Sequence, residues 1–122
     1  MQRDTRQRRA IRNVFMTSGR PLTPDEVLSM GQRLVDSLGL ATVYRNIKIL
    51  YEEGWLAEVD LPGGGTRYEL AERPHHHHFL CRVCDQAYDV HRCPDRIDQL
   101  APAGFTVDSH EITLFGVCAT CR

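Results

Sequence analysis

The stretch that decides the fold runs from residue 41 to residue 70 and reads ATVYRNIKILYEEGWLAEVDLPGGGTRYEL. Its first half has the spacing of a helix with one apolar side and one polar, basic side: Val43, Ile47 and Leu50 against Tyr44, Arg45 and Lys48. Thr42 is a candidate cap for this helix and Gly54 a candidate stop. The second half alternates like two strands around the turn sequence LPGGG. The stretch therefore predicts a basic helix followed by a β-hairpin.

Two further helices are predicted upstream. Residues 5–17 carry an apolar stripe, with Thr5 as a candidate N-cap. The second begins with a capping box, in which Thr23 is the N-cap, Pro24 takes the first helical position and Glu26 reaches back. An apolar repeat then predicts that this helix continues until Gly39: Val27, Met30, Leu34, Val35 and Leu38. Three short helices and a hairpin predict a winged helix-turn-helix domain over residues 1–70.

After residue 70 the pattern changes. The AERP segment reads as a linker, with a hinge at about residues 71–75. Strand-like stretches follow at 79–84 and 86–91, then a short helix at 94–100 and a long strand at 105–117. We therefore expect an α+β protein whose second, small α/β domain covers residues 71–122.

Composition narrows the class of protein. With 122 residues, 42% hydrophobic and 25% charged, the chain fits one globular domain or two small ones. It lacks an apolar run that would cross a membrane, and its polar start is unlike a signal peptide, so we expect a cytoplasmic protein. Net charge is −1, yet six arginines and one acidic residue lie within the first 20 positions. That basic front favours a polyanionic partner, with a solvated arginine-rich helix face as the alternative. For a winged helix-turn-helix the partner would be double-stranded DNA.

Five cysteines lie in the last 42 residues, and four of them form two CxxC pairs, Cys81/Cys84 and Cys118/Cys121. An odd number in a reducing compartment argues against a disulfide framework. Two such pairs supply the four thiolates of a closed, tetrahedral structural Zn²⁺ site. A thioredoxin-type redox pair is disfavoured because no βαβ setting precedes either motif.

Four consecutive histidines, residues 75–78, precede the first CxxC pair. In an extended segment alternate side chains face opposite ways, so one run can serve two metal sites. His76 and His78 with Glu69 and Asp89 would form a mixed nitrogen and oxygen site for Fe²⁺, Mn²⁺ or Zn²⁺. His75 and His77 would face His110 and Cys93. The alternative for any single histidine is an ordinary polar surface residue.

DNA contacts are expected from the third helix and from the N-terminus. Thr42, Tyr44 and Arg45 are placed to meet base edges or phosphates. Arginines at positions 3, 6, 8 and 9 would bind phosphates or enter a minor groove, with Arg3 and Arg8 as the leading candidates.

Three motifs, TVYRN (42–46), HHHHFLCRVC (75–84) and HEITLFGVCATC (110–121), resemble the ferric uptake regulator (Fur) family, and the resemblance covers nearly the whole chain. It implies a homodimeric, metal-activated repressor whose winged helix binds a palindromic operator and whose second domain dimerises. By motif, Cys81, Cys84, Cys118 and Cys121 match the structural zinc site. Glu69, His76, His78 and Asp89 match the regulatory site, and His75, His77 and His110 match an additional site. Cys93 stands where many members have a glutamate, which favours zinc there.

Two departures leave the regulatory metal open among zinc, iron and manganese. The stretch GRPLTPDE (19–26) lacks the histidine ligand of many iron and peroxide sensors, and no cysteine lies near Glu69 as in many zinc sensors. Glu58, Asp60 or His91 would be a substitute ligand. A peroxide sensor of the same family is an alternative. A small zinc hydrolase is disfavoured because the chain has no HExxH motif, and a metal-storage protein because it has a recognition helix.

Overall fold

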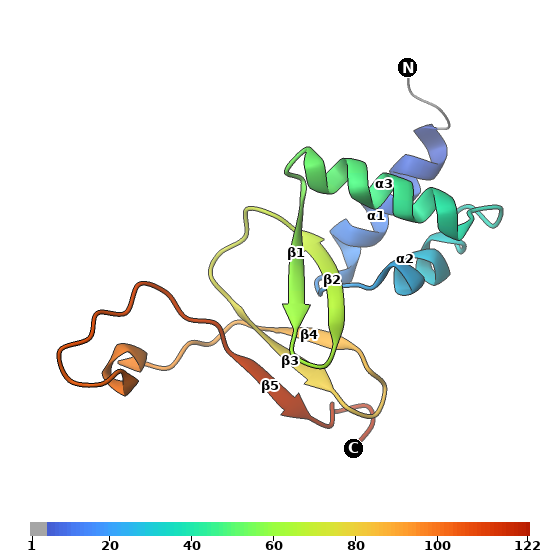
Figure 1. Cartoon of the computed structure of the whole chain (residues 1–122). Helices are drawn as coiled ribbons and strands as arrows, with labels where there is room; N and C mark the ends of the chain where they lie inside the picture. The colour runs from blue at the N-terminus through green and yellow to red at the C-terminus, as the bar shows by residue number, and fades with distance from the viewer. Residues whose placement is uncertain (1–4) are drawn as a thin grey trace.

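A computed structural model describes residues 5–122 (Figure 1). Three helices come first, then a two-stranded hairpin and a three-stranded sheet. Their bounds are α1 Thr5–Ser18, α2 Pro24–Gly31, α3 Leu40–Glu52, β1 Leu56–Leu61, β2 Gly65–Leu70, β3 His77–Cys81, β4 Ala87–Val90, the 3₁₀ helix η1 Ile97–Leu100 and β5 Thr113–Gly116. In the second sheet β3 is central, antiparallel to β4 and parallel to β5. The predicted α+β class is confirmed.

The helices and the hairpin enclose the main core. Twelve buried apolar residues form it: Ala10, Ile11, Val14, Phe15, Leu22, Val27, Val35, Leu38, Val43, Ile47, Leu50 and Leu56. Phe15 packs edge-on against Trp55, with 6.4 Å between ring centroids. Leu22 pairs with Tyr68 of β2 and so ties the segment before α2 to the hairpin. The apolar side predicted for the third helix is the side that this core buries, which leaves its basic side to solvent.

The second helix starts as predicted and ends early. The Thr23 hydroxyl accepts the N–H of Glu26 at 3.1 Å, and the Glu26 carboxylate accepts the N–H of Thr23 at 2.9 Å. The predicted continuation to Leu38 is wrong, because α2 ends at Gly31 and the chain turns there. A Cβ at Gly31 would lie 2.6 Å from Leu38 Cδ2, so glycine allows Leu38 to fold back onto the helix. Leu34, which a longer helix would bury, is 55% exposed.

The start of α3 also differs from the prediction. Gly39 is the N-cap and Thr42 lies inside the helix, where its hydroxyl accepts from Arg45 Nη2 at 3.2 Å. The predicted cap at Thr42 is therefore wrong. Gly54 follows the helix with φ +82°, a conformation that side chains with a Cβ rarely adopt, which explains the stop at that position.

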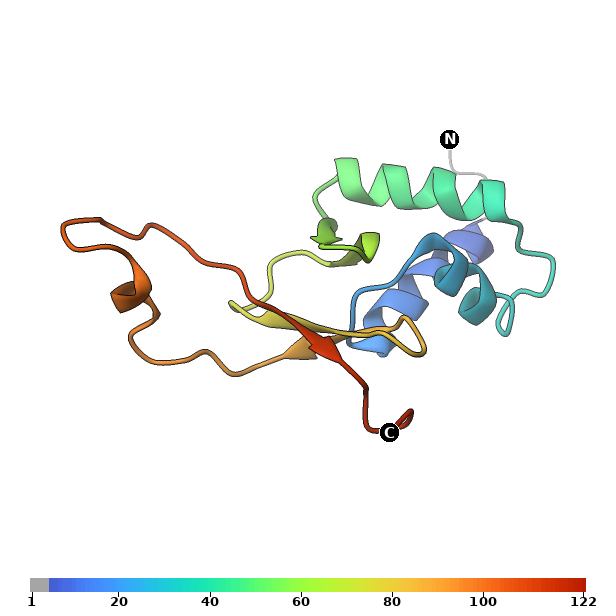
Figure 2. The ribbon, with the colours of Figure 1, turned by 60° about the horizontal axis from the view of Figure 1, so that its bottom comes forward.

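The C-terminal sheet is shorter than predicted. Only residues 113–116 of the expected strand 105–117 are β-structure, because β3 pairs with them from His78↔Thr113 to Cys81↔Gly116 and no described strand lies beside residues 105–112. The expected helix at 94–100 is a single 3₁₀ turn, Ile97–Leu100. The segment between β4 and β5 therefore projects as a lobe from the body of the molecule (Figures 1 and 2).

The tip of the hairpin rests on the C-terminal sheet. Leu61 of β1 is buried against Leu80 of β3 and Ala87 of β4. A Cβ at Gly64 would lie 2.8 Å from Leu80 Cδ2, so the glycine-rich tip permits a close approach. The fully buried Arg67 guanidinium lies 3.5 Å from Glu26 and 3.4 Å from Asp85, which belong to opposite halves of the chain. In residues 5–122 no helix is long and apolar enough to cross a membrane.

Candidate metal centres and nucleic-acid interface

Four cysteine sulfurs meet where the end of β3 approaches the C-terminus. Cys81, Cys84, Cys118 and Cys121 lie with their Sγ atoms within 4.8 Å of one another. The separation of Cys84 Sγ and Cys118 Sγ is 3.9 Å. Thiolates held 2.3 Å from one tetrahedral zinc stand about 3.8 Å apart, so the spacing fits that ion. All four cysteines are free thiols.

Backbone donors prepare this cluster for negative charge. Cys81 Sγ accepts the N–H of Cys84 at 3.5 Å and that of Cys118 at 3.3 Å. These two hydrogen bonds lower the pKa of Cys81 to about 6. The hydrogen bond from Tyr88 likewise lowers the pKa of Cys118. The hydrogen bond with Cys118 raises the pKa of Cys121 to about 12, because the second thiolate of a tight cluster ionises against the first.

A second cluster joins the hairpin to the C-terminal sheet. Glu69 comes from β2, His76 and His78 from the histidine run, and Asp89 from β4. The Glu69 carboxylate lies 3.0 Å from His76 Nε2 and 3.1 Å from His78 Nε2. Asp89 Oδ1 is buried without a hydrogen-bond partner and lies 3.8 Å from His76 Nε2. A buried carboxylate oxygen without a donor, facing imidazole nitrogens, is the arrangement that a divalent cation would satisfy.

Protonation in this cluster suits a metal ion. Burial disfavours ionisation of Glu69, but hydrogen bonds from His78 and His76 outweigh it and hold the pKa of that carboxyl below its usual value. His76 Nδ1 lies 2.8 Å from the Pro74 carbonyl, a contact that orients the ring with Nε2 toward the cluster, as in metal-binding histidines whose other nitrogen is anchored. A metal ion bound through Nε2 would take the place of the proton that this nitrogen shares with Glu69.

The cluster opens into a cavity of about 690 Å³ between the hairpin and the sheet. Glu58 and Asp60, two of the suggested substitute ligands, line this cavity, whereas His91 is exposed and does not. The ligand atoms that converge in the cluster include none from Glu58, Asp60 or His91. Glu58 lies 3.5 Å from the Tyr68 hydroxyl, and Asp60 accepts from the Thr66 hydroxyl at 2.7 Å.

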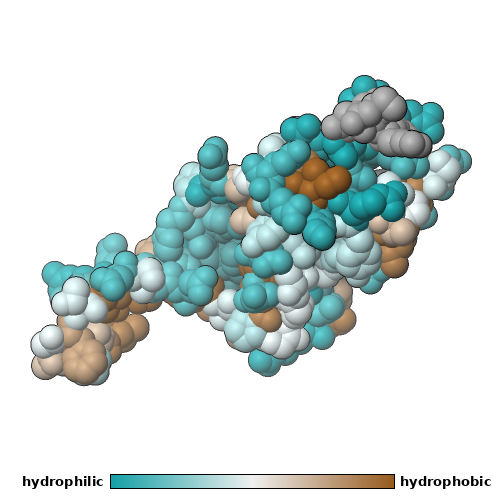
Figure 3. Space-filling model, turned by 45° about the horizontal axis from the view of Figure 1, so that its top comes forward, coloured by the Kyte–Doolittle hydropathy of each residue, from teal (hydrophilic) through white to brown (hydrophobic). Residues whose placement is uncertain are grey.

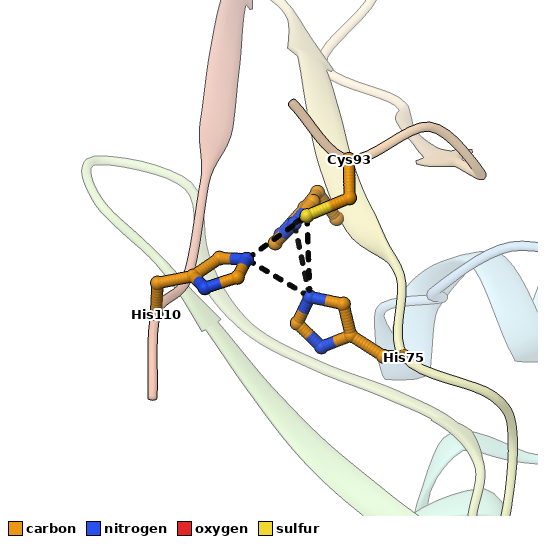
Figure 4. A group of neighbouring side chains, drawn as sticks. His75, Cys93 and His110 are labelled. Atoms are coloured by element: carbon orange, nitrogen blue, oxygen red, sulfur yellow. Dashed lines mark hydrogen bonds between the residues drawn. The ribbon is translucent and has the colours of Figure 1, made fainter. Parts of the chain in front are cut away.

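A third cluster occupies the opposite face of the histidine run. Figure 4 shows His75, His110 and Cys93 pointing toward one another, and His77 completes the group. Cys93 Sγ lies 3.1 Å from His110 Nε2 and 3.5 Å from His77 Nε2, and His75 Nε2 lies 3.1 Å from both of the other histidine nitrogens. Burial, followed by the neighbouring His75 and His110, lowers the pKa of His77 and keeps that ring neutral.

One ring of the third cluster carries its proton on the nitrogen that faces the cysteine. His77 Nδ1 accepts the N–H of Ile112 at 3.2 Å. A neutral His77 ring with Nδ1 as acceptor carries its proton on Nε2, the nitrogen that faces Cys93. An ion bound through that nitrogen would have to displace the proton.

Helix α3 lies on the far side of the helical half from the C-terminal sheet (Figure 2). Tyr44 is 54% exposed, and Arg45 and Lys48 are exposed beside it. Thr42 is half-buried. Arg8 of α1 donates through Nε to Asn46 Oδ1 at 2.8 Å, which joins α1 to α3, and Arg3 lies outside the described residues.

Exposed apolar side chains gather on the projecting lobe, where Figure 3 shows hydrophobic surface at the end of the molecule away from the helices. Leu100 is 83% exposed and Phe105 is 70% exposed. Leu114 and Val117, on and after β5, add to the apolar surface of the C-terminal half.

Two arginines near these sites were given no role by the sequence. Arg67 spans the two halves, and Arg73 lies beside Glu69 and Asp89. A basic residue four positions after Glu69 was the one available signal for Arg73, but that spacing matters in helices and this segment is not helical. The buried Asn46 was also missed.

Comparison with known proteins gives matches over almost the whole chain. The model of the ferric uptake regulator family matches residues 2–115. The ferric uptake regulation protein of Campylobacter upsaliensis is 30% identical over 123 residues, covering 97% of this chain and 79% of that protein. The zinc uptake regulation protein of Mycobacterium tuberculosis is 32% identical, with 98% and 95% covered. A solved structure of a zinc-bound manganese uptake regulator aligns with a TM-score of 0.83 at 27% identity, covering 96% of this chain and 91% of its own. The three names mention three different metals.

Proposed function

The chain belongs to the ferric uptake regulator family of metal-responsive, DNA-binding transcriptional repressors, and we propose that the cluster of Glu69, His76, His78 and Asp89 is its regulatory metal site. One observation carries the proposal. Asp89 Oδ1 is buried without a hydrogen-bond partner and faces His76, whose Nδ1 contacts the Pro74 carbonyl. The family is one of transcriptional regulators, so we assign no catalytic step to these residues.

The position of the ligands suggests how the signal reaches DNA. Glu69 ends the hairpin of the DNA-binding domain, which we place at residues 1–70, whereas His76, His78 and Asp89 belong to the metal-binding domain at 71–122. A bound divalent ion would supply positive charge that holds these four side chains together across the hinge at about 71–75. With the hinge fixed, the angle between the domains is fixed, and DNA binding no longer requires an additional ordering step. Metal thereby acts as corepressor.

The four cysteines are assigned to a structural zinc ion. Their spacing fits Zn²⁺, the set is closed to a fifth ligand, and backbone N–H groups stabilise the thiolate of Cys81. The site joins the end of β3 to the C-terminus. Because free energy of metal binding at such a site contributes directly to folding, zinc would hold the C-terminal sheet in place.

His75, His77, Cys93 and His110 are assigned to an additional metal site. A thiolate beside three imidazoles favours zinc over iron or manganese. Loading there requires the proton on His77 Nε2 to be displaced, so we expect metal binding at this site to weaken as the pH falls.

We assign DNA reading to α3 and dimerisation to the lobe and β5. Tyr44 and Arg45 are exposed on α3 and would contact DNA together with the half-buried Thr42, and Arg3 and Arg8 would contact phosphates. The exposed apolar surface around Leu100 and Phe105 would be covered by a second copy of the chain. A symmetric dimer would present its two α3 helices to successive major grooves roughly 34–36 Å apart, which implies a palindromic operator.

Zinc, iron and manganese all suit the nitrogen and oxygen donors of the regulatory site, and iron would also permit peroxide sensing by oxidation of a ligand histidine. The second candidate function, a peroxide sensor, rests on the absence of a thiolate from this cluster. A mass gain of about one oxygen on a peptide containing His76 and His78, after Fe²⁺ and peroxide, would support it.

The test is the double variant His76→Ala/His78→Ala. A duplex selected from a random pool by the wild-type protein serves as probe, and its affinity is measured by fluorescence anisotropy while Zn²⁺, Mn²⁺ or anaerobic Fe²⁺ is titrated. We expect the variant to lose metal-dependent binding while retaining its cysteine-bound zinc. Operator binding equal to wild type in excess metal would refute the assignment. The matched control, His91→Ala, removes an exposed histidine outside the clusters.

A further inference from the structure

Arg73 is the one described cation paired with the regulatory carboxylates. It follows the end of β2 by three residues, within the proposed hinge. Its Nη2 contacts Asp89 Oδ2 closely, and its Nη1 lies 3.6 Å from Glu69 Oε1. Asp89 is almost fully buried, with 3% of its side chain exposed, and Glu69 has 9% exposed. Buried carboxylates of this kind require a nearby positive charge.

The two oxygens of Asp89 have different surroundings. Oδ2 is paired with Arg73, whereas Oδ1 is without a donor and faces His76. On Glu69, Oε1 is shared by Arg73 and His78. The guanidinium therefore lies at the edge of the space into which four ligand atoms converge, and it already neutralises part of the charge that would attract a divalent ion.

We propose that Arg73 is a built-in counter-cation of the regulatory site, which pairs with Glu69 and Asp89 across the hinge and sets the metal concentration at which the site fills. The proposal rests on the regulatory assignment above and adds a residue that is not itself a ligand. Without metal, Arg73 holds the two carboxylates of different domains together. On metal binding, its positive charge opposes the incoming ion, so the site responds only at a higher free metal concentration.

Arginine suits this role because its planar guanidinium can contact two carboxylates at once and stays protonated at all physiological pH values. A lysine has the same charge, but it is concentrated on one ammonium group that lacks the planar fork of a guanidinium. The charge and the two-point contact can therefore be separated by substitution. Arg73→Gln removes both, and Arg73→Lys retains the charge but weakens the bridge.

The experiment measures Mn²⁺ binding by competition with a fluorescent chelator, on full-length protein that retains its cysteine-bound zinc. We expect Arg73→Gln to bind Mn²⁺ roughly tenfold more tightly, since a neighbouring positive charge is lost. Arg73→Lys should stay within about threefold of wild type. Arg33→Gln, an exposed arginine in the turn after α2, removes the same charge far from the site and should change nothing.

A second readout follows the bridge without metal. Amide hydrogen exchange at residues 71–78 of the Mn²⁺-free protein should be faster in both Arg73 variants than in wild type. Unchanged or weaker Mn²⁺ affinity in Arg73→Gln would overturn the counter-cation role, as would unchanged exchange in both variants. The regulatory assignment fails separately: in that case His76→Ala/His78→Ala would still bind Mn²⁺ with wild-type stoichiometry and affinity.

Discussion

The helical half and the C-terminal half of the chain are held together in different ways. Twelve apolar side chains form one core among the helices and the hairpin, whereas residues 71–122 contribute only Leu80 and Ala87 to the second described cluster. The same short half supplies all four residues of the cysteine cluster, all four of the His75 cluster, and three of the four in the cluster that contains Glu69. Residues 1–70 gain stability from apolar burial, and we propose that residues 71–122 depend on metal ions and on a partner that covers their apolar surface.

The largest effect should follow from Cys84→Ser. Loss of one thiolate weakens zinc binding, and the C-terminal sheet has little apolar burial to compensate. We expect the sheet to lose its protection from amide exchange and the protein to become monomeric, as measured by exchange mass spectrometry and light scattering. The helices should keep most of their circular dichroism signal.

Cys93→Ser is the comparison, because Cys93 is the one cysteine outside the four-cysteine cluster and belongs to the additional site. It should leave the cysteine-bound zinc in place, so exchange around Cys81 and Cys118 should stay at the wild-type level. A stable dimer of Cys84→Ser with no bound zinc would contradict the view that metal stabilises this half.

The next largest effect should follow from a substitution in the helical half. Leu50→Ala removes a side chain that is 1% exposed in the helical core. We expect a loss of about 4 kcal/mol in the free energy of unfolding of that half, measured by urea denaturation with zinc present. The zinc content should stay at the wild-type level. Loss of zinc together with the helical signal would show that the two halves unfold as one unit.

The sequence predicted best those elements whose signal is local. The capping box at Thr23 and the apolar side of α3 depend on neighbours within one or two helical turns. The end of α2 was missed because an apolar repeat continues to Leu38, and it is the contact of Leu38 with Gly31 that turns the chain. The long strand was missed because strand length depends on a neighbouring strand, and β3 ends the pairing at Thr113.

Alternation along the histidine run predicted correctly which residues would come together. His76 and His78 meet Glu69 and Asp89, and His75 and His77 meet Cys93 and His110. Their metal roles stay predictions. The contacts of Arg73 with Glu69 and Asp89 could not be predicted, because a linker segment has no periodicity from which the direction of a side chain can be inferred.

The smallest effect concerns the contact between the two halves. The buried Arg67 is shared by Glu26 on α2 and Asp85 after the first CxxC pair, at 3.5 and 3.4 Å. Glu26→Gln keeps a capping oxygen for Thr23, and Asp85→Asn suits the positive φ of 62° at that position. Either change alone leaves Arg67 one carboxylate. We therefore expect each single variant to cost less than about 1 kcal/mol.

The double variant leaves a fully buried guanidinium without a carboxylate partner. Its cost should exceed the sum of the singles by roughly 2 kcal/mol in urea denaturation, at the low end for buried pairs because Asp85 is largely exposed. Such coupling between Glu26 on α2 and Asp85 after the first CxxC pair would mean that Arg67 links the two halves independently of the regulatory metal. Additive losses would mean instead that the hairpin tip holds them together through the contacts of Leu61 with Leu80 and Ala87. In that case the cluster of Glu69, His76, His78 and Asp89, with Arg73 beside it, would be the charged connection between the two regions that affects stability.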